Sequence, residues 1–215
     1  MKIKLYHYVH CPFCIRVRMA LGFFQLPYES IVLPYDDEKT PVELTGKKML
    51  PIAVIDGTAS NESLDIISLL DKNDRLKLSV TLYNNTFLEL NALLNKWGEQ
   101  VHSLAMPYWI WTPEFTPASR HYFQSKKEIK RGPFKDLVLR RAFFEEKLQN
   151  DLEILKKELR PFYQSDKMTI YDILIASHLW GLYVVPEFQF TDELHSYLQK
   201  VKTLCHFDYH KDFWC

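Results

Sequence analysis

The sequence lacks several features that would place a protein in a broad class at once. Its 27 basic and 27 acidic side chains leave no formal net charge, so it has none of the basic excess typical of nucleic-acid binding. It contains no apolar run of the roughly 18–20 residues that a membrane helix needs, and its first residues do not form a signal peptide pattern. It also shows no internal repeat and no low-complexity tract. These absences predict a cytoplasmic globular protein that binds neither nucleic acid nor membrane.

Cysteine is scarce and unevenly placed. The 215 residues contain four, at positions 11, 14, 205 and 215. Thiols stay reduced in the cytoplasm, so we expect no structural disulfide framework. One close pair and two distant residues favour a redox motif, Cys11-Pro12-Phe13-Cys14, with Cys205 and Cys215 as incidental thiols. The alternative is a zinc site completed by Cys205 and His206 or by His210 and Cys215, but those residues lie far along the chain and Pro12 fits redox use better.

Hydrophobic periodicity predicts a mixed α/β domain over residues 1–72. The predicted order is strand, helix, strand, helix, two strands and helix. The first crossover suits a parallel strand pair, and Asp56-Gly57 marks a two-residue hairpin between an antiparallel pair. The result is a mixed four-stranded sheet with helices packed on it. The ranges are Ile3–Tyr8, Phe13–Phe24, Tyr28–Leu33, Pro41–Thr45, Ile52–Ile55, Thr58–Ser60 and Ser63–Asp71.

The rest of the chain predicts a linker over residues 73–80 and an all-helical domain over residues 81–215. Proline and Gly-Pro breakers separate the candidate helices. Within this domain, Lys126–Arg131 is interpreted as a solvated helix end. The aromatic run Tyr108–Trp111 is interpreted as core packing, with a hydrophobic groove beside the cysteines as the alternative. The predicted helices are Thr81–Leu104, Pro117–Lys130, Phe134–Glu158, Ile170–Leu182 and Asp192–Thr203.

The cysteine motif follows a predicted strand and opens a predicted helix. A helix N-terminus offers unpaired N–H groups and a partial positive charge, which stabilise a thiolate at Cys11. The thiolate is the attacking species in disulfide exchange, so Cys11 is the candidate catalytic nucleophile. Cys14 lies one helical turn on, and we expect it to be the more buried, resolving thiol. Arg16 and Arg18 add positive charge and His10 precedes the nucleophile; the sequence leaves open whether these side chains act on it or face solvent.

Two further positions predict a binding site beside the motif. Leu50-Pro51 immediately precedes the hairpin, where thioredoxin-like folds have a cis proline facing the active-site cysteine; the Leu50 backbone can then pair with an extended peptide. Glu62-Ser63 begins the next helix, whose N-terminus suits a carboxylate while Glu62 suits an ammonium group. Simple helix capping is the alternative for this pair. Together with Cys11, the two positions favour glutathione, whose γ-glutamyl end carries both charges.

On these residues the chain resembles glutaredoxins, specifically the two-domain bacterial glutaredoxin 2 family with glutathione-transferase architecture. In the first domain the resemblance rests on Tyr8–Cys14, Leu50–Ile52 and Asn61–Ile66, and in the second on Thr116–Phe123 with the following Lys126–Glu128. Thr169–Asp172 also looks like the S/T-x-x-D capping box of the transferase helical domain, a structural role for Thr169 and Asp172. The resemblance implies a thioredoxin-like domain followed by an all-α domain.

The resemblance further implies a monomeric enzyme that uses glutathione as co-substrate, without a metal, to reduce protein disulfides and glutathione mixed disulfides. Cys11 would attack and Cys14 would resolve protein disulfides. Phe13 stands where glutaredoxins more often have Tyr, which keeps the ring and loses the hydroxyl, and Leu50 stands where Val is more usual. The residues implied to hold glutathione are Phe13, Leu50, Pro51, Glu62 and Ser63.

Two other classes share parts of this pattern. Omega-type glutathione transferases, dehydroascorbate reductases and the membrane-associated prostaglandin E synthase type place a nucleophilic cysteine at the same helix start, but the first two usually lack a residue like Cys14. Transferase-like proteins of the stringent-starvation type bind RNA polymerase and have lost the catalytic cysteine. The presence of both Cys11 and Cys14 therefore favours dithiol exchange over either alternative.

Overall fold

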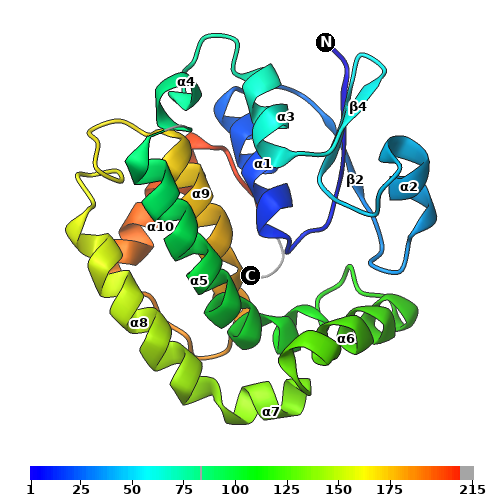
Figure 1. Ribbon diagram of the computed structural model, residues 1–215, viewed down its shortest axis with the longest axis vertical. Helices are drawn as coiled ribbons and strands as arrows, with labels where there is room; N and C mark the ends of the chain where they lie inside the picture. The colour runs from blue at the N-terminus through cyan, green and yellow to red at the C-terminus, as the bar shows by residue number, and fades with distance from the viewer. Residues whose placement is uncertain (83, 209–215) are drawn as a thin grey trace.

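A four-stranded mixed sheet organises the first half of the chain (Figure 1). The computed structural model describes residues 1–82 and 84–208. Strand β1 (Ile3–His7) pairs in parallel with β2 (Glu29–Val32) and antiparallel with β3 (Ile52–Ile55), which pairs with β4 (Thr58–Ser60). The order β2-β1-β3-β4 confirms the predicted mixed sheet. Asp56 and Gly57 both adopt positive φ, 48° and 92°, as a two-residue hairpin requires.

Three helices cover this sheet. Helices α1 (Pro12–Phe23) and α3 (Ser63–Leu70) pack together on one side, and α2 (Lys39–Thr45) lies on the other (Figure 1). Proline is favoured at the first helical position because its missing N–H has no intrahelical partner there, and Pro12 begins α1 in this way. Eight of the twelve α1 residues are buried, because α1 also packs against helix α9 (Ile170–Leu179) of the second half.

The second half consists of helices arranged around one long helix (Figure 1). The elements are α4 (Leu78–Thr81), α5 (Asn85–Trp109), α6 (Pro117–Arg131), α7 (Phe134–Leu139), α8 (Arg141–Lys157), α9 (Ile170–Leu179), the 3₁₀ turn η1 (Trp180–Val184) and α10 (Asp192–Leu204). The long helix α5 packs on α7, α8 and α9. Helix α6 packs on α7 and lies at the end of the helical layer nearest α2 and β2 (Figure 1). No helix in the described part of the chain is long and apolar enough to cross a membrane.

Helix α9 is buried over its whole length and begins at the capping box that the sequence suggested. The Thr169 side chain accepts from the backbone of the first turn, and the Asp172 Oδ2 accepts from the Thr169 N–H at 2.8 Å. The other carboxylate oxygen of Asp172 accepts from the Tyr163 N–H at 2.8 Å and from the Tyr197 hydroxyl at 2.9 Å. One side chain therefore ties together the start of α9, the preceding loop and α10.

Three of the predicted helices differ clearly from those in the structure. The predicted helix Phe134–Glu158 is split at Arg140, which has φ −95° and ψ 13° and separates α7 from α8. The predicted helix Thr81–Leu104 instead runs from Asn85 to Trp109, because Asn84 caps its start and Pro107 is accommodated within its last turn. The predicted helix Ile170–Leu182 changes to 3₁₀ geometry after Leu179.

Candidate active site

The two cysteines of the motif lie at the start of α1 with different exposure. Cys11 is the N-cap residue, with extended backbone angles and a partly exposed side chain, and its carbonyl accepts from the Ile15 N–H at 2.9 Å. Cys14 is fully buried, and its Sγ accepts from the Tyr8 N–H at 3.4 Å. This difference gives one accessible thiol and one covered thiol a single helical turn away.

The protein environment favours ionisation of Cys11 and opposes ionisation of Cys14. A hydrogen bond from the Cys14 thiol, assisted by the backbone N–H groups of Phe13 and Cys14 and by the charge of Arg16, lowers the pKa of Cys11 below its ordinary value. Burial, followed by the proximity of Cys11, raises the pKa of Cys14 well above its ordinary value. Cys11 is therefore the thiol of the pair that ionises first, and Cys14 retains its proton to higher pH.

The two arginines of α1 have separate roles in the structure. Arg16 is buried, and its guanidinium lies 4.5 Å from the centroid of the Phe13 ring. Burial lowers the pKa of Arg16 to about 10, while Cys11 acts in the opposite direction, so Arg16 stays charged beside Cys11 at neutral pH. Arg18 instead donates to the Asp208 carbonyl at 2.8 Å and lies over the Phe207 ring.

His10 connects the cysteine motif to the helical half of the chain. Its buried Nε2 lies 2.7 Å from the Thr112 Oγ1 and 2.5 Å from the Glu114 Oε1. Its ring also stacks on Trp109, with centroids 5.2 Å apart and planes 6° from parallel. The residue before Cys11 is thus held by groups more than 98 positions away in the sequence, which no local pattern could predict.

A cavity of about 470 Å³ opens beside Cys11 between the two halves of the chain. Of the residues implied to hold glutathione, Phe13 and Leu50 line it with Cys11, and the Leu50-Pro51 peptide bond is cis. Glu62 and Ser63 do not line this cavity; Glu62 precedes α3 without a side-chain capping bond, and the buried Ser63 begins the helix. The other lining residues are Tyr8, Pro12, Tyr35, Lys48, Met49, His102, Met106, Trp109, Tyr122, Phe123, Lys126 and Lys127.

Several lining residues were missed by the sequence analysis. Tyr8 stacks on Tyr35 with centroids 4.0 Å apart, and Lys48 donates to the Tyr35 carbonyl at 2.9 Å and to the Tyr122 hydroxyl at 2.8 Å. Trp109, from the aromatic run Tyr108–Trp111, belongs to the core and also lines the cavity beside the cysteines. Its side chain is buried and donates to the Gly181 carbonyl at 3.2 Å. These contacts join segments that are distant in sequence, so no spacing signal marks them.

The remaining cysteines lie away from the motif or outside the described residues. Cys205 is a buried free thiol at the end of α10, and burial raises its pKa. Cys215 and His210 lie outside the described residues. Within residues 1–82 and 84–208, three or more His, Cys, Asp or Glu side chains do not gather in a group that could hold a metal ion.

Comparison with known proteins identifies the family. Residues 5–77 match the glutathione S-transferase N-terminal domain, and residues 89–211 match the glutaredoxin 2 C-terminal domain. The chain is 35% identical over 159 residues to glutaredoxin 2 of Escherichia coli strain K12, covering 72% of this chain and 73% of that protein. The chain belongs to the glutaredoxin 2 family. It is therefore an oxidoreductase of the glutaredoxin class that acts with glutathione.

Solved structures place this glutaredoxin among transferase-shaped proteins. Glutaredoxin 2 from Salmonella typhimurium, in complex with glutathione, superimposes with a TM-score of 0.83 at 31% identity, covering 96% of this chain and 95% of that chain. The glutathione transferase GSTFuA3 from Phanerochaete chrysosporium gives a TM-score of 0.81 at 16% identity, which relates the fold alone. Prostaglandin E synthase 2 of Danio rerio is 38% identical over 116 residues, 51% of this chain and 29% of that protein.

Proposed function

We propose that Cys11 is the nucleophile and Cys14 the resolving thiol of this glutathione-dependent thiol–disulfide oxidoreductase. The observation that carries the proposal is the opposite perturbation of the two thiols: a partly exposed Cys11 with a lowered pKa and a buried Cys14 with a raised pKa. A thiolate attacks disulfides and a thiol does not. At neutral pH this geometry directs the attack to Cys11. Cys14 stays protonated until Cys11 has formed a mixed disulfide and no longer carries a negative charge.

Reduction of a glutathione mixed disulfide needs Cys11 alone. The Cys11 thiolate attacks the glutathione sulfur; the S–S bond of the substrate breaks, and the substrate sulfur leaves as a thiolate and takes a proton. Cys11 is then disulfide-bonded to glutathione. A second glutathione thiolate attacks the glutathione sulfur of that bond, which releases oxidised glutathione and restores the Cys11 thiolate.

Reduction of a protein disulfide also uses Cys14. Cys11 attacks one sulfur of the substrate and forms a mixed disulfide, and the other substrate sulfur leaves as a thiolate. Once Cys11 is no longer charged, Cys14 loses its proton and attacks the Cys11 Sγ, so that the second substrate thiolate leaves. Two glutathione molecules then reduce the Cys11–Cys14 disulfide and become one molecule of oxidised glutathione, which balances the two electrons and two protons given to the substrate.

Glutathione is proposed to bind in the cavity beside Cys11. The Leu50 backbone, next to Pro51, would pair with its cysteinyl part, and Phe13 would cover the sulfur with a ring that is 46% exposed. Glu62 and Ser63 would hold the γ-glutamyl end at the start of α3. The lysines of the cavity wall supply cations for the remaining carboxylate; they are Lys48, Lys126 and Lys127.

We further infer that the natural substrates are protein disulfides and glutathionylated proteins, that the protein acts as a monomer and that it works in the cytoplasm. The support for the substrate class is the dithiol pair itself, since a monothiol suffices for glutathione mixed disulfides. The reducing cytoplasm is the compartment in which glutathione can regenerate Cys11. Gel filtration tests the monomeric state, and cell fractionation tests the cytoplasmic location.

The deciding experiment compares wild type with Cys11→Ser and Cys14→Ser in a glutathione-coupled assay. With a glutathione mixed disulfide as substrate, Cys11→Ser should be inactive and Cys14→Ser should keep its activity. With a protein disulfide, both variants should lose most of their activity. An active Cys11→Ser protein would overturn the mechanism, and full protein-disulfide reduction by Cys14→Ser would remove the resolving role of Cys14.

A further inference from the structure

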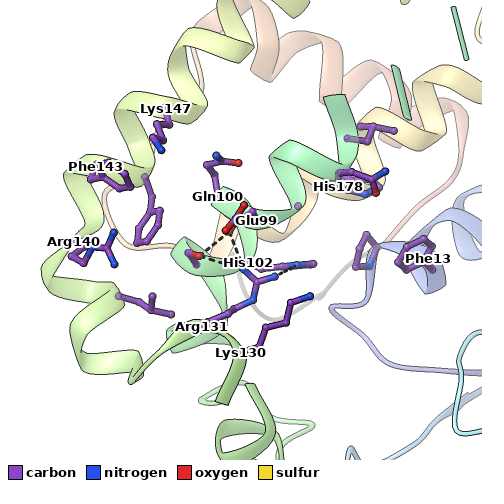
Figure 2. Close-up of a pocket in the computed structure, with 17 residues that line it drawn as sticks. Phe13, Glu99, Gln100, His102, Lys130, Arg131, Arg140, Phe143, Lys147 and His178 are labelled. Atoms are coloured by element: carbon purple, nitrogen blue, oxygen red, sulfur yellow. Dashed lines mark hydrogen bonds between the residues drawn. The ribbon is translucent and has the colours of Figure 1, made fainter. Parts of the chain in front are cut away.

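A second, larger cavity lies beside the proposed active site and takes no part in the mechanism above. Its volume is about 650 Å³. In Figure 2, Phe13 and His178 lie at one end of this cavity, and Phe143 and Lys147 of α8 lie at the other. Pro12, Phe13 and His102 line both cavities. The two therefore meet at the first turn of α1, on which the nucleophile lies.

The walls of this second cavity carry an excess of positive charge. Lys130 and Arg131 end α6, Arg140 separates α7 from α8, and Lys147 lies on α8. Across residues 1–82 and 84–208, none of these four side chains takes part in an ion pair. Glu99 is the one acidic side chain among the described residues of the lining. Cations that line one cavity without carboxylate partners favour an anionic ligand there.

One of the four cations is already fixed in place. The Arg131 Nη1 donates to the Glu99 carbonyl at 3.2 Å and to the Ser103 Oγ at 3.4 Å, and its Nη2 donates to the His102 Nδ1 at 3.3 Å (Figure 2). Burial and the nearby Arg131 lower the pKa of His102 to about 3, so the ring is neutral and accepts this bond. A guanidinium held by α5 before a ligand arrives loses little further freedom when it binds.

The same cavity offers an unused hydrogen-bonding group. Gln100 is only 6% exposed and lines the cavity, yet its Oε1 finds no hydrogen-bond partner among the described residues. Buried polar atoms in native proteins are nearly always paired, so this amide oxygen indicates a ligand that brings an N–H donor. Carboxylates together with N–H groups are what an acidic stretch of polypeptide carries.

We propose that this second cavity binds an acidic segment of the polypeptide substrate and selects cysteines with Asp or Glu residues beside them. The inference rests on the proposed function and extends it to a substrate class. In a glutathionylated protein, glutathione would occupy the smaller cavity and Cys11 would attack at the boundary between the two. The polypeptide half of the disulfide then leaves across Pro12 and Phe13 into the cationic cavity. Its carboxylates would meet Lys130, Arg131, Arg140 and Lys147, and a backbone N–H would meet Gln100.

The test uses two synthetic peptides that differ in charge alone. Both carry one glutathionylated cysteine, flanked by Glu residues in the first and by Gln residues in the second. The measured quantity is the ratio of kcat/KM for the Glu peptide to kcat/KM for the Gln peptide, with wild type and with the double variant Arg140→Gln/Lys147→Gln. The control is Lys157→Gln, which removes a positive charge from the last turn of the same helix, away from the cavity.

The wild-type ratio should be about ten, as expected for partly screened ion pairs. It should fall to about three in the double variant, which keeps Lys130 and Arg131, while Lys157→Gln keeps the wild-type ratio. The ratio should also decline between about 0.01 M and 1 M salt, as the screening length falls from about 30 Å to about 3 Å. Lys147→Glu should raise the rate for a Lys-flanked peptide relative to the Glu peptide.

Two outcomes separate this inference from the function on which it rests. A wild-type protein that reduces both peptides at equal rates would overturn the acidic selectivity and leave the glutaredoxin mechanism intact. A wild-type protein that reduces neither peptide would overturn the proposed function. An equal loss of the ratio in Lys157→Gln and in the double variant would also refute the cavity as its source, because it would assign the preference to overall charge.

Discussion

Replacement of Asp172 by Ala should destabilise the protein more than any comparable change on its surface. The side chain is completely buried and accepts its three shortest hydrogen bonds from the Thr169 N–H and the Tyr163 N–H, each at 2.8 Å, and from the Tyr197 hydroxyl at 2.9 Å. The Thr169 hydroxyl adds a longer one at 3.4 Å. Alanine leaves all three donors without an acceptor. It also disconnects α9, whose ten residues are all buried, from α10 and from the loop before it.

The expected loss follows from those three bonds. A buried polar group left unpaired costs about 1–3 kcal/mol. Three such groups in one network, with partial relaxation and entry of water, should lower the free energy of unfolding by about 3–5 kcal/mol. For a chain of 215 residues that corresponds to a fall in Tm of roughly 10 °C. Asp172→Asn should lose less, because its amide oxygen can still accept from Tyr163 and Tyr197 while its NH₂ group faces the Thr169 N–H.

The measurement is thermal and urea unfolding followed by circular dichroism at about pH 8. Burial raises the pKa of Asp172 to about 6, so the carboxyl is ionised in both folded and unfolded chains at that pH. Asp192→Ala is the matched control, since Asp192 is an exposed acid in the first turn of α10 and should cost less than about 1 kcal/mol. A cost for Asp172→Ala no larger than that of the control would refute the network as the anchor of α9.

Four further substitutions have equally definite outcomes. Cys14→Ala should raise the Cys11 pKa because it removes the thiol that donates to the Cys11 thiolate, and Arg16→Met should raise the same pKa because it removes a buried positive charge. Thiolate absorbance measured against pH gives the Cys11 pKa of both variants. An unchanged Cys11 pKa would contradict the assigned causes. Because the Cys11 pKa is lowered, wild-type activity should persist as pH falls below the range of an ordinary thiol and be lost only at the lower Cys11 pKa, whereas Arg16→Met should lose activity at a higher pH. Gly22→Ala should destabilise the packing of α1 against the end of α10, since its Cβ would lie 1.7 Å from a backbone carbonyl oxygen there. Gly98→Ala, with open space around its Cβ in the middle of α5, should instead stabilise the fold by up to about 1 kcal/mol. Denaturation midpoints measure both variants. A Gly22→Ala protein more stable than Gly98→Ala would refute the packing argument at both glycines.

The sequence by itself determined the features whose causes are local. Pro12 and the alternation of apolar residues place a strand and a helix on either side of Cys11, and a spacing of three residues brings Cys14 onto the next turn of that helix. The capping box of Thr169 and Asp172 likewise joins residues three positions apart. Such features depend on backbone geometry that neighbouring residues dictate, so the fold class and the placement of the Cys11 and Cys14 pair at the start of one helix could be predicted from the sequence.

Tertiary structure alone decided the surroundings of that pair. The helix break at Arg140 has no proline or glycine to mark it, and the link from His10 to Glu114 spans more than a hundred positions. The basic run ending α6 was predicted to be a solvated helix end; its side chains are exposed or partly exposed, yet Lys127 lines the cavity at Cys11 and Arg131 lines the cationic one. Cavities and their charge arise where the surfaces of distant segments meet. Contacts between distant segments follow no periodic pattern in the sequence, so the sequence alone could not predict them.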